Sequence, residues 1–261
     1  MIDPEQRTVI RQQLRHLETS AQIHILYACE SGSRAWGFPS ADSDYDVRFL
    51  YIRPKDWYLR VDYEAQRDVV ELPINDLLDI NGWDLKKALK LLVKSNPALI
   101  EWLHSSIVYQ QNAEFIADLK ALLPRFYSPR ACYYHYSHMA QNNYREWLKG
   151  DTVRAKKYFY VLRPILAMEW ISRDKGIVPM EFEALLNGIV PPGPLKEAIT
   201  DLLQQKRVGF EQEDIPRIDI ISEFIEQELE RYASLSNSLP DATADYMVLN
   251  RFFLNWLDKH G

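Results

Sequence analysis

The chain has 261 residues, of which 47% are hydrophobic and 26% are charged, and its formal net charge at pH 7 is −6. This composition is that of a globular protein with enough apolar residues for one large domain or two of ordinary size. The negative net charge excludes a surface that is basic throughout, as in a non-specific nucleic-acid-binding protein, although a local basic strip is compatible with it.

Three further features indicate the compartment. No apolar run is long enough for a membrane-spanning helix. The first residues, Met-Ile-Asp-Pro-Glu-Gln-Arg, lack the basic and then apolar pattern of a signal peptide. The two cysteines, Cys29 and Cys132, are far apart in sequence, and in a chain without an export signal we expect two reduced core thiols. We therefore expect a cytoplasmic protein.

The first part of the chain mixes helical and strand patterns. Asp3-Pro4 is an N-cap and first-turn pair, and the apolar residues after it predict a helix from 4 to about 20. Apolar runs predict strands over 23–29 and 44–52, with a Gly-Ser loop and a short helical turn between them. Residues 55–66 are ambiguous.

A hairpin and several helices are predicted next. Two short runs, Val69 to Ile74 and Leu77 to Ile80, flank Asn75-Asp76 as the arms of a hairpin. Asp84 is a helix N-cap, and Asn96-Pro97 starts another helix. The elements expected up to residue 123 are then a helix from 85 to about 92, a helix from 97 to 103, a strand over 107–110 and a helix over 113–123.

Strand patterns stop at about Ser128. Long helical patterns follow, broken at Gly150, Gly176 and Pro191-Pro192-Gly193. They cover about 129–149, 151–174, 194–207, 217–235 and 242–258. The sequence thus predicts an α+β protein, in which a mixed sheet with flanking helices occupies residues 1–127 and an all-helical domain occupies residues 128–261.

The segment from Ser31 to Arg48 carries most of the chemistry. Gly32 and Ser33 follow a predicted strand and offer backbone N–H groups and a hydroxyl that can hold a phosphate. Asp44 and Asp46 begin the next strand and project from the same face, because side chains two residues apart in a strand share a face. Such a pair repels itself unless a cation lies between the carboxylates, and oxygen ligands favour Mg²⁺ or Mn²⁺.

Gly-Ser, a spacer and Asp-x-Asp, matched by Gly32, Ser33, Asp44 and Asp46, resemble the signature of a nucleotidyltransferase superfamily. That superfamily includes DNA polymerase beta, poly(A) polymerases and the aminoglycoside nucleotidyltransferases. The longer string Gly-Ser-Arg-Ala-Trp-Gly-Phe…Ser-Asp-Tyr-Asp-Val-Arg is more similar to one bacterial and phage subgroup of predicted nucleotidyltransferases, some encoded beside RNA ligases. Later strings fit that subgroup, so that the resemblance covers at least residues 20–108: Gly82-Trp83-Asp84-Leu85-Lys86-Lys87, Ser95-Asn96-Pro97 and Glu101-Trp102-Leu103.

A polymerase-type site with two ions needs a third carboxylate, from the adjacent strand. Asp76 is explained by the hairpin turn and Asp84 by helix capping. Asp79 lies inside an apolar strand, where a lone charge is costly without a partner, and the superfamily's order of elements also favours it. Glu71, on the outer strand of the hairpin, is the alternative.

The resemblance implies a metal-dependent nucleotidyltransferase that moves a nucleoside monophosphate from an NTP to a hydroxyl acceptor and releases pyrophosphate. Asp44, Asp46 and Asp79 would be its catalytic and metal-binding residues, with Mg²⁺ or Mn²⁺ as cofactor. The association with RNA ligases suggests an RNA end as acceptor. Two rival functions share these residues: a nucleotide-binding regulatory module without turnover, and a protein adenylyltransferase of toxin–antitoxin type.

Other residues are candidates for nucleotide binding. Arg34 follows the Gly-Ser pair and could neutralise phosphate charge or form a surface ion pair. Helical domains that follow this type of head commonly help to bind the nucleotide or the acceptor. Lys157 and Arg163 are therefore candidates for phosphate contacts, with a solvated helix face as the alternative. Arg48 shares the face of Asp44 and Asp46, so it could form a salt bridge to them or reach the substrate, and the shared face favours the salt bridge.

Overall fold

The structure is a computed structural model that describes residues 2–40, 43–74, 77–209, 214–232, 239–240, 242 and 245–260. The chain forms two compact units. Unit 1 consists of Met1–Arg34, Asp44–Tyr127 and Ala242–Gly261, and unit 2 consists of Ala35–Ser43 and Ser128–Asp241.

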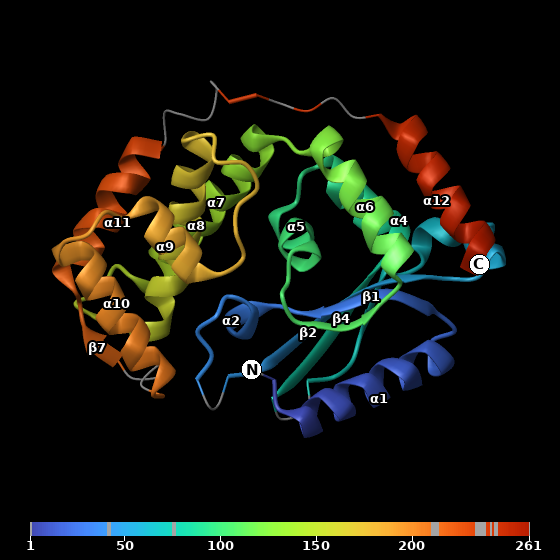
Figure 1. Ribbon diagram of the computed structural model, residues 1–261, viewed down its shortest axis with the longest axis horizontal. Coiled ribbons are helices and arrows are strands. Elements are labelled where there is room, and N and C mark those ends of the chain that lie inside the picture. Colours follow the sequence, from blue (N-terminus) through green and yellow to red (C-terminus); the bar gives the residue numbers. More distant parts are fainter. Residues whose placement is uncertain are drawn as a thin grey trace. The chain divides into compact units, whose positions relative to one another are not determined.

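A five-stranded mixed sheet forms the centre of unit 1 (Figure 1), with the strand order β3-β4-β2-β1-β5. Strands β2 and β4 are parallel, and the other neighbouring pairs are antiparallel. The strands are β1 (His24–Glu30), β2 (Tyr45–Ile52), β3 (Val69–Glu71), β4 (Leu78–Asp84) and β5 (Val108–Gln111).

Helices cover both faces of this sheet. Helix α1 packs its apolar stripe, Ile10, Leu14 and Leu17, against one face, while α4 and α6 lie on the other side (Figure 1). Helix α12 also belongs to unit 1, where the Trp256 ring lies 5.2 Å from the Phe115 ring. The helices are α1 (Pro4–Ser20), α2 (Gly32–Ala35), α3 (Lys55–Tyr58), α4 (Leu85–Val93), α5 (Pro97–Leu103), α6 (Ala113–Phe126) and α12 (Tyr246–His260), with a 3₁₀ turn at Tyr63–Ala65.

Unit 2 is built around the buried helix α8, which is apolar on nearly every side. The short segment 35–43 contributes to the same core, because the Phe38 ring lies 5.0 Å from Phe159 and 5.5 Å from Phe182. The elements are α7 (Pro129–Trp147), β6 (Thr152–Arg154), α8 (Ala155–Ser172), α9 (Phe182–Ile189), α10 (Pro194–Arg207), β7 (Asp214–Pro216) and α11 (Asp219–Tyr232), with β6 and β7 antiparallel.

The α+β class is confirmed, and four details of the prediction are corrected. The units differ from the expected domains in segments 35–43 and 242–261, since a helical or aromatic pattern does not say which core it covers. The second part of the chain is not all-helical, since it contains β6 and β7. These strands were not predicted because they are too short to show a strand pattern in the sequence. Helix α9 was not expected. Strand β4 runs to Asp84 rather than Ile80, and the predicted turn at Asn75-Asp76 lies outside the described residues.

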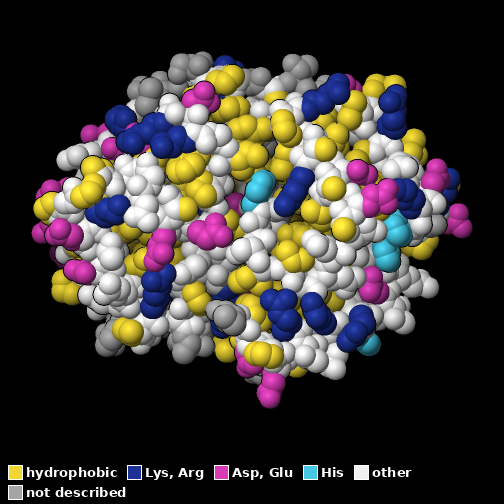
Figure 2. Space-filling view, viewed as in Figure 1, with side chains coloured by type: hydrophobic (Ala, Val, Ile, Leu, Met, Phe, Trp, Pro, Cys, Tyr) yellow, Lys and Arg dark blue, Asp and Glu magenta, His cyan; other side chains and the backbone are white. Residues whose placement is uncertain are grey.

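The surface agrees with the negative net charge. Lys and Arg side chains are interspersed with Asp and Glu on the face seen in Figure 2, which is not uniformly basic. Within the described part of the chain, no helix combines the length and the apolar character needed to cross a membrane.

Candidate active site

The turn between β1 and α2 brings the Gly32 backbone against the Asp46 carboxylate. Gly32 has φ = +57°, and a Cβ at this residue would lie 1.9 Å from Oδ2 of Asp46. Both facts require glycine, because other residues pay for a positive φ and any side chain would collide with the carboxylate. The Gly-Ser turn and the Asp-x-Asp strand therefore meet in space.

Asp46 and Asp79 are direct neighbours across the parallel strands β2 and β4. Arg48 lies between their carboxylates, with Nη2 at 3.0 Å from Oδ1 of Asp46 and 2.7 Å from Oδ2 of Asp79. The salt bridge expected for Arg48 is thus confirmed for Asp46, and its second partner is Asp79 in place of Asp44. The side chains are partly open to solvent, with 17% of Arg48, 27% of Asp46 and 31% of Asp79 exposed.

Asp44 and Arg34 border this pair. Asp44 is exposed and directly precedes β2. Its carbonyl oxygen accepts a hydrogen bond of 3.1 Å from Nε of Arg34, whose guanidinium lies 3.8 Å from the centre of the Tyr45 ring. Arg34 is therefore held beside the Gly32 turn by its own loop, and Ser33 is partly exposed on the same turn.

The electrostatics of the pair reflect burial and competing charges. Burial raises the pKa of Asp46 above its usual value, the Arg48 guanidinium opposes this shift, and the carboxylates of Asp79 and Asp44 add to it. Each of these carboxylates thus destabilises the ionised form of Asp46. The Arg48 guanidinium between the carboxylates therefore favours the ionised form of Asp46.

Glu30 is a residue of this site that the sequence interpretation missed. It is fully buried, accepts a hydrogen bond from the Tyr109 hydroxyl and accepts another of 3.0 Å from the backbone N–H of Asp46. Burial raises the pKa of Glu30 to about 7, although the hydrogen bond from Tyr109 acts to lower it. The available signal was a charged residue at the end of an apolar strand, two residues before Gly32.

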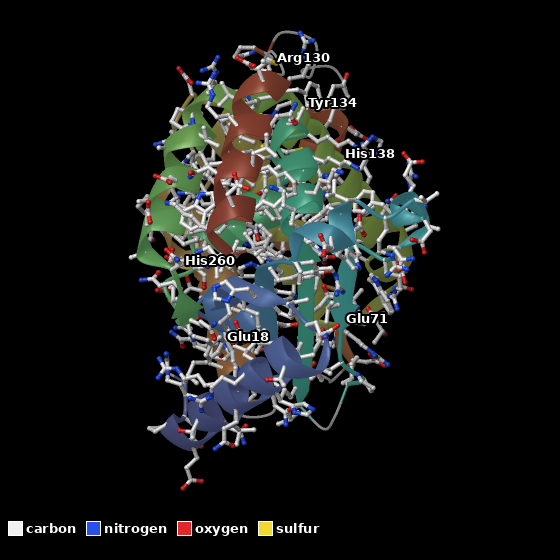
Figure 3. All side chains as sticks on the ribbon, turned by 90° about the vertical axis from the view of Figure 1, so that its right-hand side faces the viewer. Glu18, Glu71, Arg130, Tyr134, His138 and His260 are labelled. Carbon is white, nitrogen blue, oxygen red and sulfur yellow. The ribbon has the colours of Figure 1, made fainter. Side chains whose placement is uncertain are left out.

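The other candidates for a third carboxylate lie elsewhere. Glu71 lies at the outer edge of the sheet on β3 (Figure 3), opposite Asn81, and forms a salt bridge of 2.6 Å with Arg67. Asp84 caps α4 as predicted, because its carboxylate accepts a hydrogen bond of 2.8 Å from the Lys86 N–H. The same carboxylate accepts a hydrogen bond of 2.7 Å from the Tyr58 hydroxyl. Asp76 is outside the described residues.

The two candidates on α8 belong to unit 2 and differ from each other. Lys157 is partly buried, its ammonium lies 3.6 Å from the centre of the Trp147 ring, and burial lowers its pKa. Arg163 is only 2% exposed and donates to the carbonyl oxygen of Met180 at 3.2 Å. Its burial speaks against the expected phosphate contact, and we leave Arg163 out of the site.

The donor set suits a hard divalent cation. Asp46 and Asp79 offer carboxylate oxygens on one sheet face, and they already hold the positive charge of Arg48. Among the described residues, no three acidic, His or Cys side chains are gathered as a ready-made metal site. The carboxylates of Asp46 and Asp79 are chemically suited to Mg²⁺, and in this structure the Arg48 guanidinium supplies the positive charge between them.

Several known proteins are similar to this chain. The protein YcgL of Bacillus subtilis (strain 168) is 48% identical over 248 residues, which cover 95% of each chain. Two solved structures are more distant. Spectinomycin adenyltransferase AAD(9) from Enterococcus faecialis, solved with ATP and spectinomycin, has 12% identity and a TM-score of 0.49 over 89% of this chain and 100% of that one. A nucleotidyltransferase-like protein from Exiguobacterium sibiricum 255-15 has 15% identity and a TM-score of 0.35, over 87% and 76%.

A family comparison covers nearly the whole chain. The model of the RlaP family, described as the RNA repair pathway DNA polymerase beta family, matches residues 6–255. The match includes the Gly32 turn and the β2 and β4 strands that carry Asp46 and Asp79. The chain belongs to the RlaP family, and with it to the DNA polymerase beta-like nucleotidyltransferases.

Proposed function

We propose that the chain is a metal-dependent nucleotidyltransferase that transfers a nucleoside monophosphate from an NTP to the hydroxyl end of an RNA. The observation that carries the proposal is the contact between the Gly32 turn and the Asp46 carboxylate, with Asp79 beside it in register. A phosphate-binding turn and a carboxylate pair at one point are what nucleotide chemistry requires. The family's description supports RNA as the acceptor.

Each residue has a defined task in this reaction. The backbone N–H groups of the Gly32 turn and the Ser33 hydroxyl hold phosphate oxygens, and Arg34 neutralises part of their charge. Asp44, Asp46 and Asp79 would hold Mg²⁺. When bound, this ion offsets the negative charge of the attacking and leaving oxygens.

Bond changes are confined to the α-phosphorus. The acceptor hydroxyl oxygen forms a bond to it in line with the departing group, and the bond to the bridging oxygen of the β-phosphate breaks, so that pyrophosphate leaves. Asp79 accepts the hydroxyl proton as general base, because it is partly exposed and lies next to Asp46. A triad with Glu71 would place the base at the sheet edge instead.

Label transfer tests the proposal directly. The full chain is incubated with Mg²⁺, each α-³²P-labelled NTP and RNA ending in a 3′-hydroxyl or in a 3′-phosphate, with Asp46→Asn as the matched inactive variant. We expect label on the RNA that ends in a 3′-hydroxyl and none on the RNA that ends in a 3′-phosphate. Nucleotide binding by calorimetry without turnover would favour a regulatory module, and label on a host protein would favour a protein adenylyltransferase. If no acceptor received label and no nucleotide bound, the proposal would be contradicted.

A further inference from the structure

The guanidinium of Arg48 makes four contacts at the centre of the site. Nη2 bridges the carboxylates of Asp46 and Asp79 at 3.0 and 2.7 Å. Nη1 donates to the carbonyl oxygens of Val47 and Asp79 at 3.2 and 3.1 Å. A planar fork of N–H donors suits four acceptors in this arrangement, whereas a lysine ammonium has three donors on one atom. The carboxylate pair therefore contains a built-in cation.

Both oxygens of Asp46 already have a neighbour. Oδ2 is confined beside Gly32, where a Cβ would lie only 1.9 Å away. Oδ1 is the oxygen that Arg48 binds. A divalent cation that approaches Asp46 from solvent thus meets a positive charge on one oxygen and the Gly32 backbone beside the other.

Like charges on one carboxylate repel each other, and little water lies between groups in direct contact to screen them. The guanidinium and a divalent cation therefore compete for Asp46. Exchange requires only side-chain rotation, because Arg48, Asp46 and Asp79 are partly exposed while their backbones stay in the sheet. Such exchange is compatible with an intact fold.

We propose that Arg48 is the resident counter-ion of the Asp46–Asp79 pair and that a divalent cation binds by displacing its guanidinium from Asp46. The inference rests on the proposed function, since it takes these aspartates as metal ligands. Arg48 is then a positioning residue. It holds the two carboxylates together when no ion is bound, and it lowers the site's affinity for the ion.

Thermal unfolding of the full chain, with Mg²⁺ or Mn²⁺ alone and no nucleotide, tests this competition. Arg48→Met should lower Tm without the ion, because two carboxylates then face each other unpaired. The ion should restore more stability to this variant than to the natural chain. The ion concentration that gives half of the stabilisation should be lower in the variant by about fivefold or more, which is the lower end of typical coupling free energies. Arg48→Lys, which keeps the charge and loses the fork, should lie between the two.

Two further variants sharpen the test. Arg60→Met removes an arginine–aspartate pair on the surface, where Arg60 Nε lies 2.8 Å from Asp62, and should leave the Mg²⁺ response unchanged. Asp46→Asn combined with Arg48→Met should abolish the enhanced response, because it removes the ligand that the ion gains.

The results separate this proposal from the proposed function. Equal or weaker Mg²⁺ affinity in Arg48→Met would overturn the competition and leave the metal site standing. No Mg²⁺ or Mn²⁺ response in either chain would overturn the metal site itself, and the competition with it. If Arg48→Met does not fold, Arg48→Lys decides: unchanged ion affinity there would overturn the proposal.

Discussion

The backbone N–H of Asp46 donates to the buried carboxylate of Glu30 at 3.0 Å. The carbonyl oxygen of Asp46 in turn accepts a hydrogen bond of 2.8 Å from the N–H of Ser31. Both backbone groups of Asp46 are thus fixed by the two residues that directly precede Gly32. The Gly32 turn and the strand that carries Asp46 consequently keep their relative position.

Glu30→Ala should reduce both stability and activity. It leaves the Tyr109 hydroxyl and the Asp46 N–H without their acceptor, which should cost about 1–3 kcal/mol in the free energy of unfolding by urea. Glu18→Ala is the matched control (Glu18 is labelled in Figure 3). The Glu18 carboxylate accepts a hydrogen bond of 2.8 Å from the N–H of Ile25, near the other end of β1. Only Glu30→Ala should lower kcat/KM at temperatures where both variants are folded, and an equal loss in both would make Glu30 purely structural.

Gly32→Ala should abolish most activity. The Cβ displaces the Asp46 carboxylate, and a displacement of about 1 Å in a reacting group costs about a hundredfold in rate. Gly176→Ala has a similar backbone penalty, because Gly176 has φ = +81°, but a Cβ there meets nothing within 4 Å. Gly176→Ala should lose about 1–2 kcal/mol of stability from its backbone conformation alone. Gly32→Ala should lose more, because its Cβ also collides with the Asp46 carboxylate. Full nucleotidyl transfer by Gly32→Ala would disprove the assigned contact.

Ser33→Ala tests the turn separately from the carboxylates. Loss of one hydroxyl contact to a charged phosphate should lower kcat/KM by about ten- to a hundredfold, equivalent to about 1.5–3 kcal/mol. The backbone N–H groups of the turn survive, so single-turnover rates should fall without vanishing. If Ser33→Ala were inactive while Gly32→Ala kept full activity, the backbone would not be the phosphate site.

Asp44→Ala and Asp46→Ala should differ in stability although both lose Mg²⁺-dependent nucleotide binding. Asp44 is exposed, and its removal relieves repulsion, so Tm without the ion should stay the same or rise slightly. Asp46→Ala deprives Arg48 of one of its two carboxylates, and its Tm should fall. Calorimetric scans without metal measure both. A fall for Asp44→Ala alone would reverse the assignment.

Asp84 predicts a pH dependence of stability. Burial raises the pKa of Asp84 from 3.8 to about 6. Between these values the unfolded chain loses the proton while the folded chain keeps it, so the contribution of this group to stability falls as pH rises. Asp84→Asn, which can still cap α4, should flatten this slope in urea titrations from pH 4 to 6.

Local signals in the sequence predicted much of the fold. Asp3-Pro4 and the apolar stripe gave α1 from residue 4 to residue 20, and Asp84 and Asn96 were identified as caps because capping depends on neighbouring residues alone. The lone charge of Asp79 in an apolar strand indicated a partner before its position was known. Its neighbour across β2 and β4 is Asp46.

Features that depend on distant partners were not predictable in this way. Helix α12 packs in unit 1 through the contact of Trp256 with Phe115, which is far away in sequence. Segment 35–43 packs in unit 2 through the contacts of Phe38 with Phe159 and Phe182. Strands β6 and β7 pair with each other and have three residues each, too few to show the alternation of apolar and polar residues that marks a strand. Glu30 was missed because the predicted strand ended at residue 29, so that its charge was not recognised as part of the buried strand β1.

Neither unit is a continuous stretch of chain, which bears on how the protein can be divided. A fragment ending at residue 127 would retain Phe38 but lack its partners Phe159 and Phe182, and would lose the Trp256 that covers Phe115. Both losses leave large aromatic surfaces open to water, which promotes aggregation. Truncation at residue 127 therefore cuts through both cores, and a stable single-unit variant would also need a redesigned segment 35–43 and a retained helix α12.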